Sequence, residues 1–132
     1  MSKQLLQPAA WKRPKGYANG VAARGLTVSV AGMIGWDEQE QFHSDRLADQ
    51  ARQTLANVVA VLAEAGAKPA HIVRMTWYVT DRREYLDNVR EIGAAYRELI
   101  GDFGVAMTAV QVTALMEERA KIEIEVTAVV PD

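Results

Sequence analysis

The stretch AKIEIEVTAVV, at residues 120–130, carries the clearest pattern in the chain. Apolar and polar side chains alternate along it, and this period of two predicts a β-strand with one face in a core. The apolar face would carry Ile122, Ile124, Val126, Ala128 and Val130. The opposite face would carry Lys121, Glu123, Glu125 and Thr127. Such a strand needs neighbouring strands to pair with and helices to cover its apolar face.

The chain before this strand alternates between helix and strand patterns. Apolar residues at helical spacing predict one helix over residues 45–65, with Ser44 as its N-cap, and a second over residues 84–100. Alternation of side chains predicts further strands at residues 72–80 and 105–112.

Two β-rich runs near the amino terminus, at residues 17–22 and 26–33, flank the turn signal Arg24-Gly25 and predict a hairpin. Residues 1–15, rich in proline and basic residues, are expected to form an irregular arm. The predicted order is therefore ββ-α-β-α-ββ. It indicates an α+β fold with two helices on one face of a mixed sheet, and a length of 132 residues fits one domain, 1–132.

The second face of this sheet has no predicted cover. Trp77 or Tyr78, Met107 and Val129 cannot all lie under the helices, so we expect an apolar sheet face to be exposed in a single copy. An exposed apolar face of this size is typical of an interface. The pattern therefore predicts an oligomer but does not give the number of subunits.

The overall composition excludes several classes of function. A net charge of −2 gives no general attraction to nucleic acids or anionic membranes, so neither is expected as a partner. The chain has no cysteine, which excludes disulfides, thiolate metal sites and a cysteine nucleophile. No segment resembles a signal peptide or a membrane span, and a cytoplasmic location is expected.

The titratable residues offer one candidate for catalysis. His43 and His71 lack the spacing of metal ligands, so no metal site is predicted. Glu123 and Glu125 share one strand face, and burial of that face in an oligomer would leave at least one of them paired, protonated or functional. A raised pKa would suit general acid/base chemistry. Ordinary solvated charge on an edge strand is the alternative that the pattern alone favours.

Several segments together resemble a known family. They are GYANGV at 16–21, VAGMIG at 30–35, QARQTLANV at 50–58, AG at 65–66, IVRMT at 72–76, VTD at 79–81 and KIEIE at 121–125. Their order and spacing are similar to those of the RidA family, also called YjgF-like or L-PSP endoribonuclease, and the resemblance covers residues 15–131.

The resemblance implies a chorismate-mutase-like fold and a homotrimer with small-molecule pockets in the clefts between subunits. Founding members hydrolyse reactive enamines and imines, such as 2-aminoacrylate, to 2-keto acids and ammonia without a metal or another cofactor. Carried over to this chain, Glu123 matches the glutamate that positions or activates water. Tyr17 matches a tyrosine of the pocket wall, and Ala31 and Gly32 match the backbone segment that lines the pocket.

Three positions depart from the deaminase pattern. Met107 stands where the resemblance implies an arginine that binds the substrate carboxylate, and Gly93 stands where it implies an asparagine. Trp36 adds an indole after the pocket strand. We therefore expect Trp36 and Met107 to form an apolar wall for a substrate other than 2-aminoacrylate.

Three functions compete on this basis. The first is a divergent enamine/imine deaminase, similar to 2-aminomuconate deaminase, in which Arg13, Lys15, Arg74 or Arg119 could replace the lost arginine. The second is a non-catalytic trimer that binds a small molecule or a partner protein. The third is RNA cleavage, which ranks last because the chain is acidic and its histidines lack partners.

Overall fold

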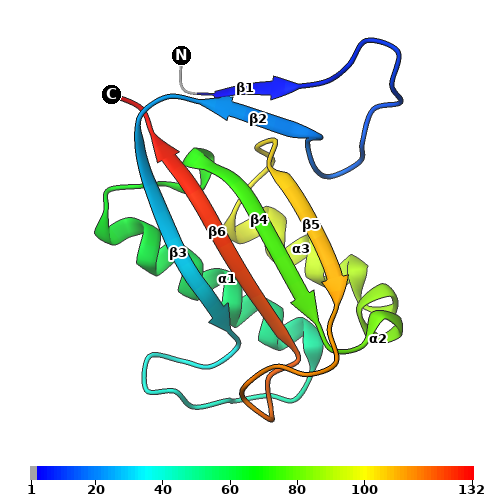
Figure 1. The fold of residues 1–132 in the computed structure, drawn as a ribbon. Helices are drawn as coiled ribbons and strands as arrows, with labels where there is room; N and C mark the ends of the chain where they lie inside the picture. Colours follow the sequence, from blue (N-terminus) through cyan, green and yellow to red (C-terminus); the bar gives the residue numbers. More distant parts are fainter. Residues whose placement is uncertain (1–2) are drawn as a thin grey trace.

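The structure, a computed structural model, describes residues 3–132 and shows a four-stranded sheet with helices on one side (Figure 1). The elements in chain order are β1 (Lys3–Leu6), β2 (Gly20–Ala23), β3 (Leu26–Ile34), α1 (Leu47–Glu64), the 3₁₀ turn η1 (Pro69–His71), β4 (Ile72–Val79), α2 (Arg82–Asp87), α3 (Val89–Leu99), β5 (Ala106–Gln111) and β6 (Ile122–Val130). This confirms a mixed α+β fold.

The strand that the sequence marks most clearly lies inside the sheet. The strand order is β3-β6-β4-β5, in which β6 runs antiparallel to both β3 and β4, while β4 and β5 are parallel. Met75 lies opposite Val126, and Trp77 lies opposite Ile124. Since residues directly opposite each other point to the same side, these four share one face.

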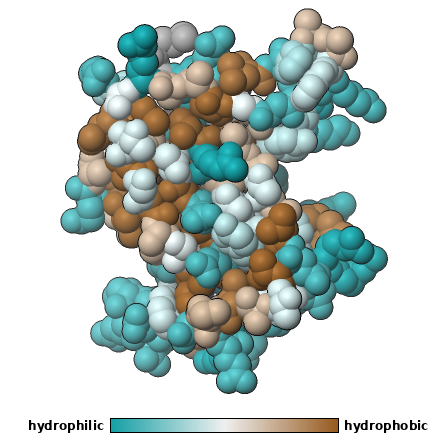
Figure 2. Space-filling view, viewed as in Figure 1, coloured by the Kyte–Doolittle hydropathy of each residue, from teal (hydrophilic) through white to brown (hydrophobic). Residues whose placement is uncertain are grey.

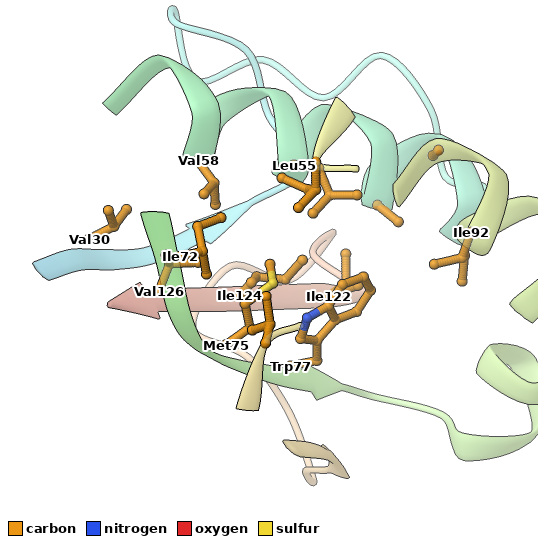
Figure 3. Close-up of a cluster of buried hydrophobic side chains, with 14 of the residues drawn as sticks. Val30, Leu55, Val58, Ile72, Met75, Trp77, Ile92, Ile122, Ile124 and Val126 are labelled. Atoms are coloured by element: carbon orange, nitrogen blue, oxygen red, sulfur yellow. The ribbon is translucent and has the colours of Figure 1, made fainter. Parts of the chain in front are cut away.

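That face forms the core under α1 and α3 (Figure 3). Ile122, Ile124 and Met75 are fully buried, as is Leu55 of α1. Burying one large apolar side chain contributes about 1.5–3 kcal/mol, so this layer provides much of the folding free energy. The buried positions confirm the apolar face predicted from alternation.

The predicted hairpin is wrong. β2 pairs with β1, and β3 pairs with β6 instead of with β2. The chain does bend at Gly25, which has φ of +140°. A Cβ there would lie 2.0 Å from the carbonyl oxygen of Val130, so the bend passes tightly over the end of β6 and carries the chain from one sheet into the other.

The arm predicted to be irregular over residues 1–15 contains a strand. Residues 3–6 form β1, whereas residues 7–15 have no helix or strand, and residues 1–2 lie outside the described part. The Nζ of Lys3 donates hydrogen bonds to the carbonyl oxygens of Ile72 (2.9 Å) and Gly104 (2.8 Å). These bonds attach the amino-terminal sheet to the main body.

Both helix predictions need correction at their boundaries. The region 84–100 contains two helices, because Asn88 ends α2 and its Nδ2 donates to the carbonyl oxygen of Glu84 at 2.7 Å. The first helix begins at Leu47 with Arg46 as N-cap. Ser44 lies outside the helix, where its Oγ accepts from the Arg46 amide (3.0 Å) and donates to Asp49 (2.8 Å).

The expectation of an apolar open face holds only in part, since Tyr78 and Val129 do lie on that face. Trp77 lies on the helix side, and so does Met107, because it is the parallel partner of Met75. The middle of the open face is polar around a depression of about 300 Å³, as Figure 2 shows by its pale and teal side chains. The polar residues of this depression are Ser29, Arg74, Thr76, Glu125 and Thr127. Among residues 3–132, no helix has the length and apolar composition to cross a bilayer.

Candidate functional site

Glu123 lies across an irregularity in the neighbouring strand. The register of β3 on β6 shifts between Val30 and Met33, so that Ala31 and Gly32 leave the regular ladder. A Cβ built on Gly32 would lie 1.9 Å from Oε2 of Glu123. The carboxylate therefore occupies the space that a side chain at position 32 would fill. Irregularities of this kind are common beside active sites, and this one brings together three predicted site residues.

The two glutamates of the open face have different environments. The hydroxyl of Tyr78 donates to Oε1 of Glu125 at 2.5 Å. This hydrogen bond is the main cause of the raised pKa of Tyr78. Glu123 is half-buried and makes no side-chain hydrogen bond or ion pair within residues 3–132. Glu123 is therefore the carboxylate without a side-chain partner in the described residues, while Glu125 is more exposed and lines the open-face depression.

A second group of candidate residues surrounds a cavity of about 210 Å³ between the sheet and the α2–α3 segment. Its wall is aromatic and apolar, and includes Trp77, Tyr85, Ile92, Tyr96 and Met107. The Trp77 ring centroid lies 6.4 Å from that of Tyr85 and 6.1 Å from that of Tyr96. For comparison, an engineered cavity of about 150 Å³ holds benzene, so this cavity has room for a phenyl-sized group.

The polar groups of the cavity wall include two phenols, one indole and the charged side chains of Arg97 and Asp102. Burial, with a smaller effect of the Asp102 charge, raises the pKa of Tyr96 to about 12, and burial also raises the pKa of Tyr85. Both phenols therefore stay protonated at neutral pH. The indole Nε1 of Trp77 is buried and has no hydrogen-bond partner in the described part of the chain. An unpaired buried donor is costly.

Tyr17 lies at the edge of this second group. The amide of Ala18 donates to the carbonyl oxygen of Val105 at 2.8 Å, and Ala18 forms a parallel bridge with Ala106 of β5. Gly16 lines the cavity, while Tyr17 itself is 45% exposed. Figure 2 shows the molecule hollowed on this side, between the amino-terminal arm and the lower part of the chain. Tyr17 can therefore contact a molecule that arrives from outside.

The two groups do not meet within one chain. Glu123 is opposite Tyr78 on the open face, and β4 separates β6 from β5. Met107 is opposite Met75 on the helix-covered side. A ligand in the cavity of one copy therefore cannot also contact Glu123 of that copy.

Trp36 belongs to neither group. It lies in the loop after β3, where its ring centroid is 5.7 Å from that of Phe42. Its carbonyl oxygen accepts a hydrogen bond from Nδ2 of Asn57 at 2.7 Å. Trp36 and Met107 thus form no common wall within one chain, and such a wall remains a prediction about contacts between copies.

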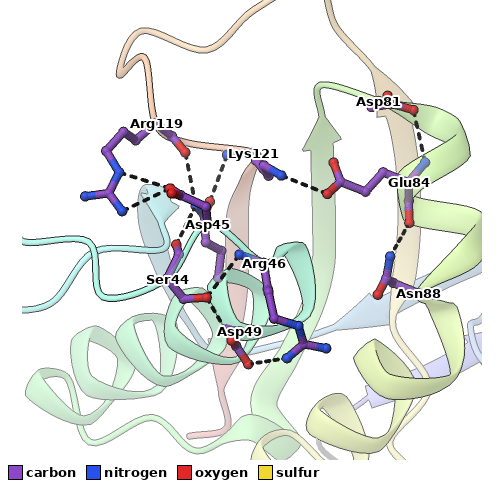
Figure 4. A network of polar contacts seen from close by, with 10 residues as sticks. Ser44, Asp45, Arg46, Asp49, Asp81, Glu84, Asn88, Arg119 and Lys121 are labelled. Carbon is purple, nitrogen blue, oxygen red and sulfur yellow. Dashed lines mark hydrogen bonds and ion pairs between the residues drawn. The ribbon is translucent and has the colours of Figure 1, made fainter.

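The basic residues considered as replacements for the missing arginine lie away from the cavity wall. Arg119 donates to Oδ1 of Asp45 at 2.9 and 3.1 Å (Figure 4), and Arg74 lies beside the open-face depression. Arg13 and Lys15 are exposed on the arm. The sequence analysis missed Arg97, which does line the cavity. The sequence did contain a clue to Arg97, because it follows Gly93 by four residues, about one helical turn.

Both histidines have structural roles. Nε2 of His43 is 2.6 Å from Oδ2 of Asp37, and this hydrogen bond is the first cause of the lowered pKa of Asp37. Nδ1 of His71 accepts from the amide of Lys68 at 3.0 Å, which caps η1. Within residues 3–132, no three histidine, aspartate or glutamate side chains form a group that could hold a metal ion.

Sequence comparison adds a family to this geometry. Residues 8–130 match the family model described as Endoribonuclease L-PSP. The 2-iminobutanoate/2-iminopropanoate deaminase of Salmonella typhimurium is 32% identical over 132 residues, covering 98% of this chain and 98% of the relative. The human protein of the same name is 32% identical over 104 residues, covering 78% of this chain and 72% of the relative.

Solved structures agree with the fold. YyfB of Yersinia pestis, a protein of unknown function in the conserved Rid family, matches with a TM-score of 0.84 and 31% identity, covering 98% of this chain and all (100%) of that chain. Escherichia coli TdcF, solved with bound serine, matches with a TM-score of 0.68 and 28% identity, covering 96% of this chain and 98% of that chain.

Proposed function

The chain belongs to the Endoribonuclease L-PSP family, the RidA or YjgF-like proteins, and we propose that it is a divergent enamine/imine deaminase. The observation that carries the proposal is the Glu123 carboxylate, which lies against Gly32 without a side-chain partner among residues 3–132. Two relatives named as 2-imino acid deaminases support the reaction class. TdcF with bound serine supports a ligand of amino-acid type.

The proposed reaction is hydrolysis of a C=N bond. An enamine first tautomerises to its imine. Glu123 accepts a proton from water while the water oxygen bonds to the imine carbon, and it then returns this proton to the imine nitrogen. From the resulting carbinolamine, Glu123 passes the hydroxyl proton to the amine, which leaves as ammonia when the C–N bond breaks and the carbonyl group forms. One water is consumed, and no electrons are gained or lost, so the reaction needs no redox partner.

The proposed site is assembled between copies, because Glu123 and Met107 lie on opposite faces of the sheet. The open face of one subunit would supply Glu123 and Gly32, and the cavity edge of the next would supply Tyr17 and Met107. A closed homotrimer would repeat this contact at each of its interfaces. Trp36 would reach the ligand only through such a contact. A cytoplasmic location is part of the same proposal and is supported by the absence of cysteine.

The direct test measures ammonia release from imines made in situ by an amino-acid oxidase. Glu123→Gln should lower kcat/KM by about 10²–10⁴-fold, since it removes the proton acceptor. Glu125→Gln is the matched control, because it changes the neighbouring carboxylate of the same face and should retain most of the activity. Equal rates in the wild type and Glu123→Gln would overturn the assigned role.

A mixing experiment tests assembly between copies. Met107→Trp should block the cavity with a second indole beside Trp77, and Glu123→Gln should remove the base. Each variant alone would be inactive. After subunit exchange, every mixed trimer would contain one interface with neither change, and activity should reappear. Continued inactivity in trimers shown to be mixed would exclude a site between copies.

A non-catalytic trimer that binds a small molecule or a partner is the second candidate. Met107 favours it, because a methionine cannot bind a substrate carboxylate as an arginine does. Stabilisation of the wild type by a 2-oxo acid, with no turnover of any imine tested, would support this candidate over the deaminase.

A further inference from the structure

We propose that Arg97 replaces the carboxylate-binding arginine that is absent at position 107, and that the substrate is an imino acid with a large apolar side chain. This inference rests on the proposed deaminase function. It names the anchor of the substrate and the chemical class of its side chain.

Arg97 lies next to Gly93 on the cavity wall. Both residues lie on α3, one turn apart, and both line the cavity together with Met107. A Cβ built on Gly93 would lie 3.4 Å from Nη1 of Arg97. The guanidinium therefore lies over the backbone of Gly93, where a longer side chain would compete with it for space. The two departures from the deaminase pattern on the cavity wall, at positions 93 and 107, thus lie on the same wall as the cation of Arg97.

Arg97 is also uncommitted, unlike neighbouring arginines. Arg46 binds Glu91 of α3 at 2.9 Å, and Arg52 binds Glu98 of α3 at 2.7 Å. In contrast, Arg97 makes no ion pair or side-chain hydrogen bond within the region that the structure describes. An arginine whose guanidinium N–H groups have no other partner can bind a carboxylate through two parallel hydrogen bonds.

Asp102 limits the strength of this site. It lines the same cavity as Arg97, and its negative charge opposes the binding of an anion there. A carboxylate ligand must therefore gain more from Arg97 than it loses to Asp102. Removing the Asp102 charge should strengthen binding, while removing the Arg97 charge should weaken it. This pair of opposite effects distinguishes an anion site from general damage to the fold.

The apolar wall of the cavity favours a large apolar side chain on the substrate. Trp77, Tyr85 and Met107 offer aromatic and thioether surface in a space of about 210 Å³. With the carboxylate at the exposed guanidinium, an apolar side chain can enter this space and exclude water from the wall. The imines of phenylalanine, leucine and methionine fit this description, whereas that of alanine would leave the cavity unfilled.

Binding of phenylpyruvate, the stable 2-oxo acid product of the phenylalanine imine, tests the anchor by calorimetry. Arg97→Gln should weaken binding by about 10–100-fold, the range for a charged hydrogen-bonded pair, with partial recovery in Arg97→Lys. Asp102→Asn should tighten binding several-fold. Arg90→Gln, an exposed arginine of the same helix away from the cavity, is the matched control and should bind as the wild type does. Thermal unfolding of each variant confirms that it is folded.

Turnover separates this inference from the proposed function. Faster hydrolysis of the phenylalanine imine than of the alanine imine, with a higher KM in Arg97→Gln, supports both. If the wild type hydrolyses imines but Arg97→Gln binds phenylpyruvate as tightly as the wild type does, the role of Arg97 is wrong and the deaminase proposal is unaffected. Arg97-dependent binding without hydrolysis of any imine overturns the deaminase and leaves the anchor standing. Absence of phenylpyruvate binding in the wild type overturns the anchor.

Discussion

Glu123 and Ile124 are neighbours on β6, yet they serve opposite sides of the molecule. Ile124 is fully buried under the helices, between Met33 of β3 and Trp77 of β4. Glu123 is on the open face, with its carboxylate against Gly32. The helix-covered face holds the chain together through apolar contact. In our proposal, the open face presents the catalytic glutamate and the surface for assembly.

If Glu123 has the proposed role, stability and function are separable along a single strand. Alternation directs every second side chain of β6 away from the core, so substitutions there need not disturb packing. The separation can be tested at single residues on the two faces.

The largest expected effect is on the covered face. Ile124→Ala should lower the free energy of unfolding by about 2–5 kcal/mol, because it leaves a cavity in a fully buried layer. Glu123→Gln, one residue away, should change it by less than about 1 kcal/mol, as expected for a polar substitution outside the core. Urea unfolding at one fixed protein concentration measures both. Similar losses of unfolding free energy in the two variants would contradict the proposed difference between the two faces.

A smaller effect is expected at the contact between Gly32 and Glu123. Gly32→Ala forces the carboxylate away, because the new Cβ would lie 1.9 Å from Oε2. We expect kcat/KM to fall by about 100-fold, the order of loss caused by misplacing a reacting group by about 1 Å. Adding Gly32→Ala to Glu123→Gln should cost little more, since Gly32 acts through Glu123. Additive losses in the double variant would contradict this coupling.

The smallest expected effect concerns the ionisation of two tyrosines, Tyr78 on the open face and Tyr96 on the cavity wall. The pKa of Tyr78 on the open face is raised mainly by its hydrogen bond to Glu125, while burial raises the pKa of Tyr96 to about 12. Glu125→Gln should therefore lower the pKa of Tyr78 and leave that of Tyr96 unchanged, as measured by NMR titration of labelled tyrosines. A Tyr78 pKa that does not respond would show that another group holds it.

The raised pKa of Tyr78 also determines the direction in which stability changes with pH. The native state favours the neutral phenol, so this contribution to stability is complete below the unfolded pKa of about 10. It is lost as the pH rises through the higher native pKa. Glu125→Gln should reduce this loss in alkaline unfolding experiments.

Much of the fold could be predicted because alternation and helical spacing are local signals. They identified β6, its buried face and both helical regions, whereas Glu123 was singled out from Glu125 only by the resemblance to the RidA family. Strand pairing is not local: the turn at Gly25 is real, but only contacts with Val130 show that it leads to β6 and not back to β2. Likewise, the face of the sheet on which Met107 lies follows only from its parallel pairing with Met75.

The missed residue has a similar explanation. Arg97 resembles any exposed arginine of an amphipathic helix, and no motif marks it. Its relevance comes from a glycine one turn earlier and from a cavity that forms only when α3 lies on the sheet. A search for cations four residues from lost motif positions would have found it.

The position of β6 has a consequence for the order of events during synthesis. It leaves the ribosome after the other three strands of its sheet, yet it lies between β3 and β4. β4 can pair with β5 as soon as both have emerged, but β3 must wait for a partner encoded almost 100 residues later, and unpaired strands of nascent chains are prone to aggregation. A ribosome that stops before residue 122 therefore releases a chain without the centre of its sheet.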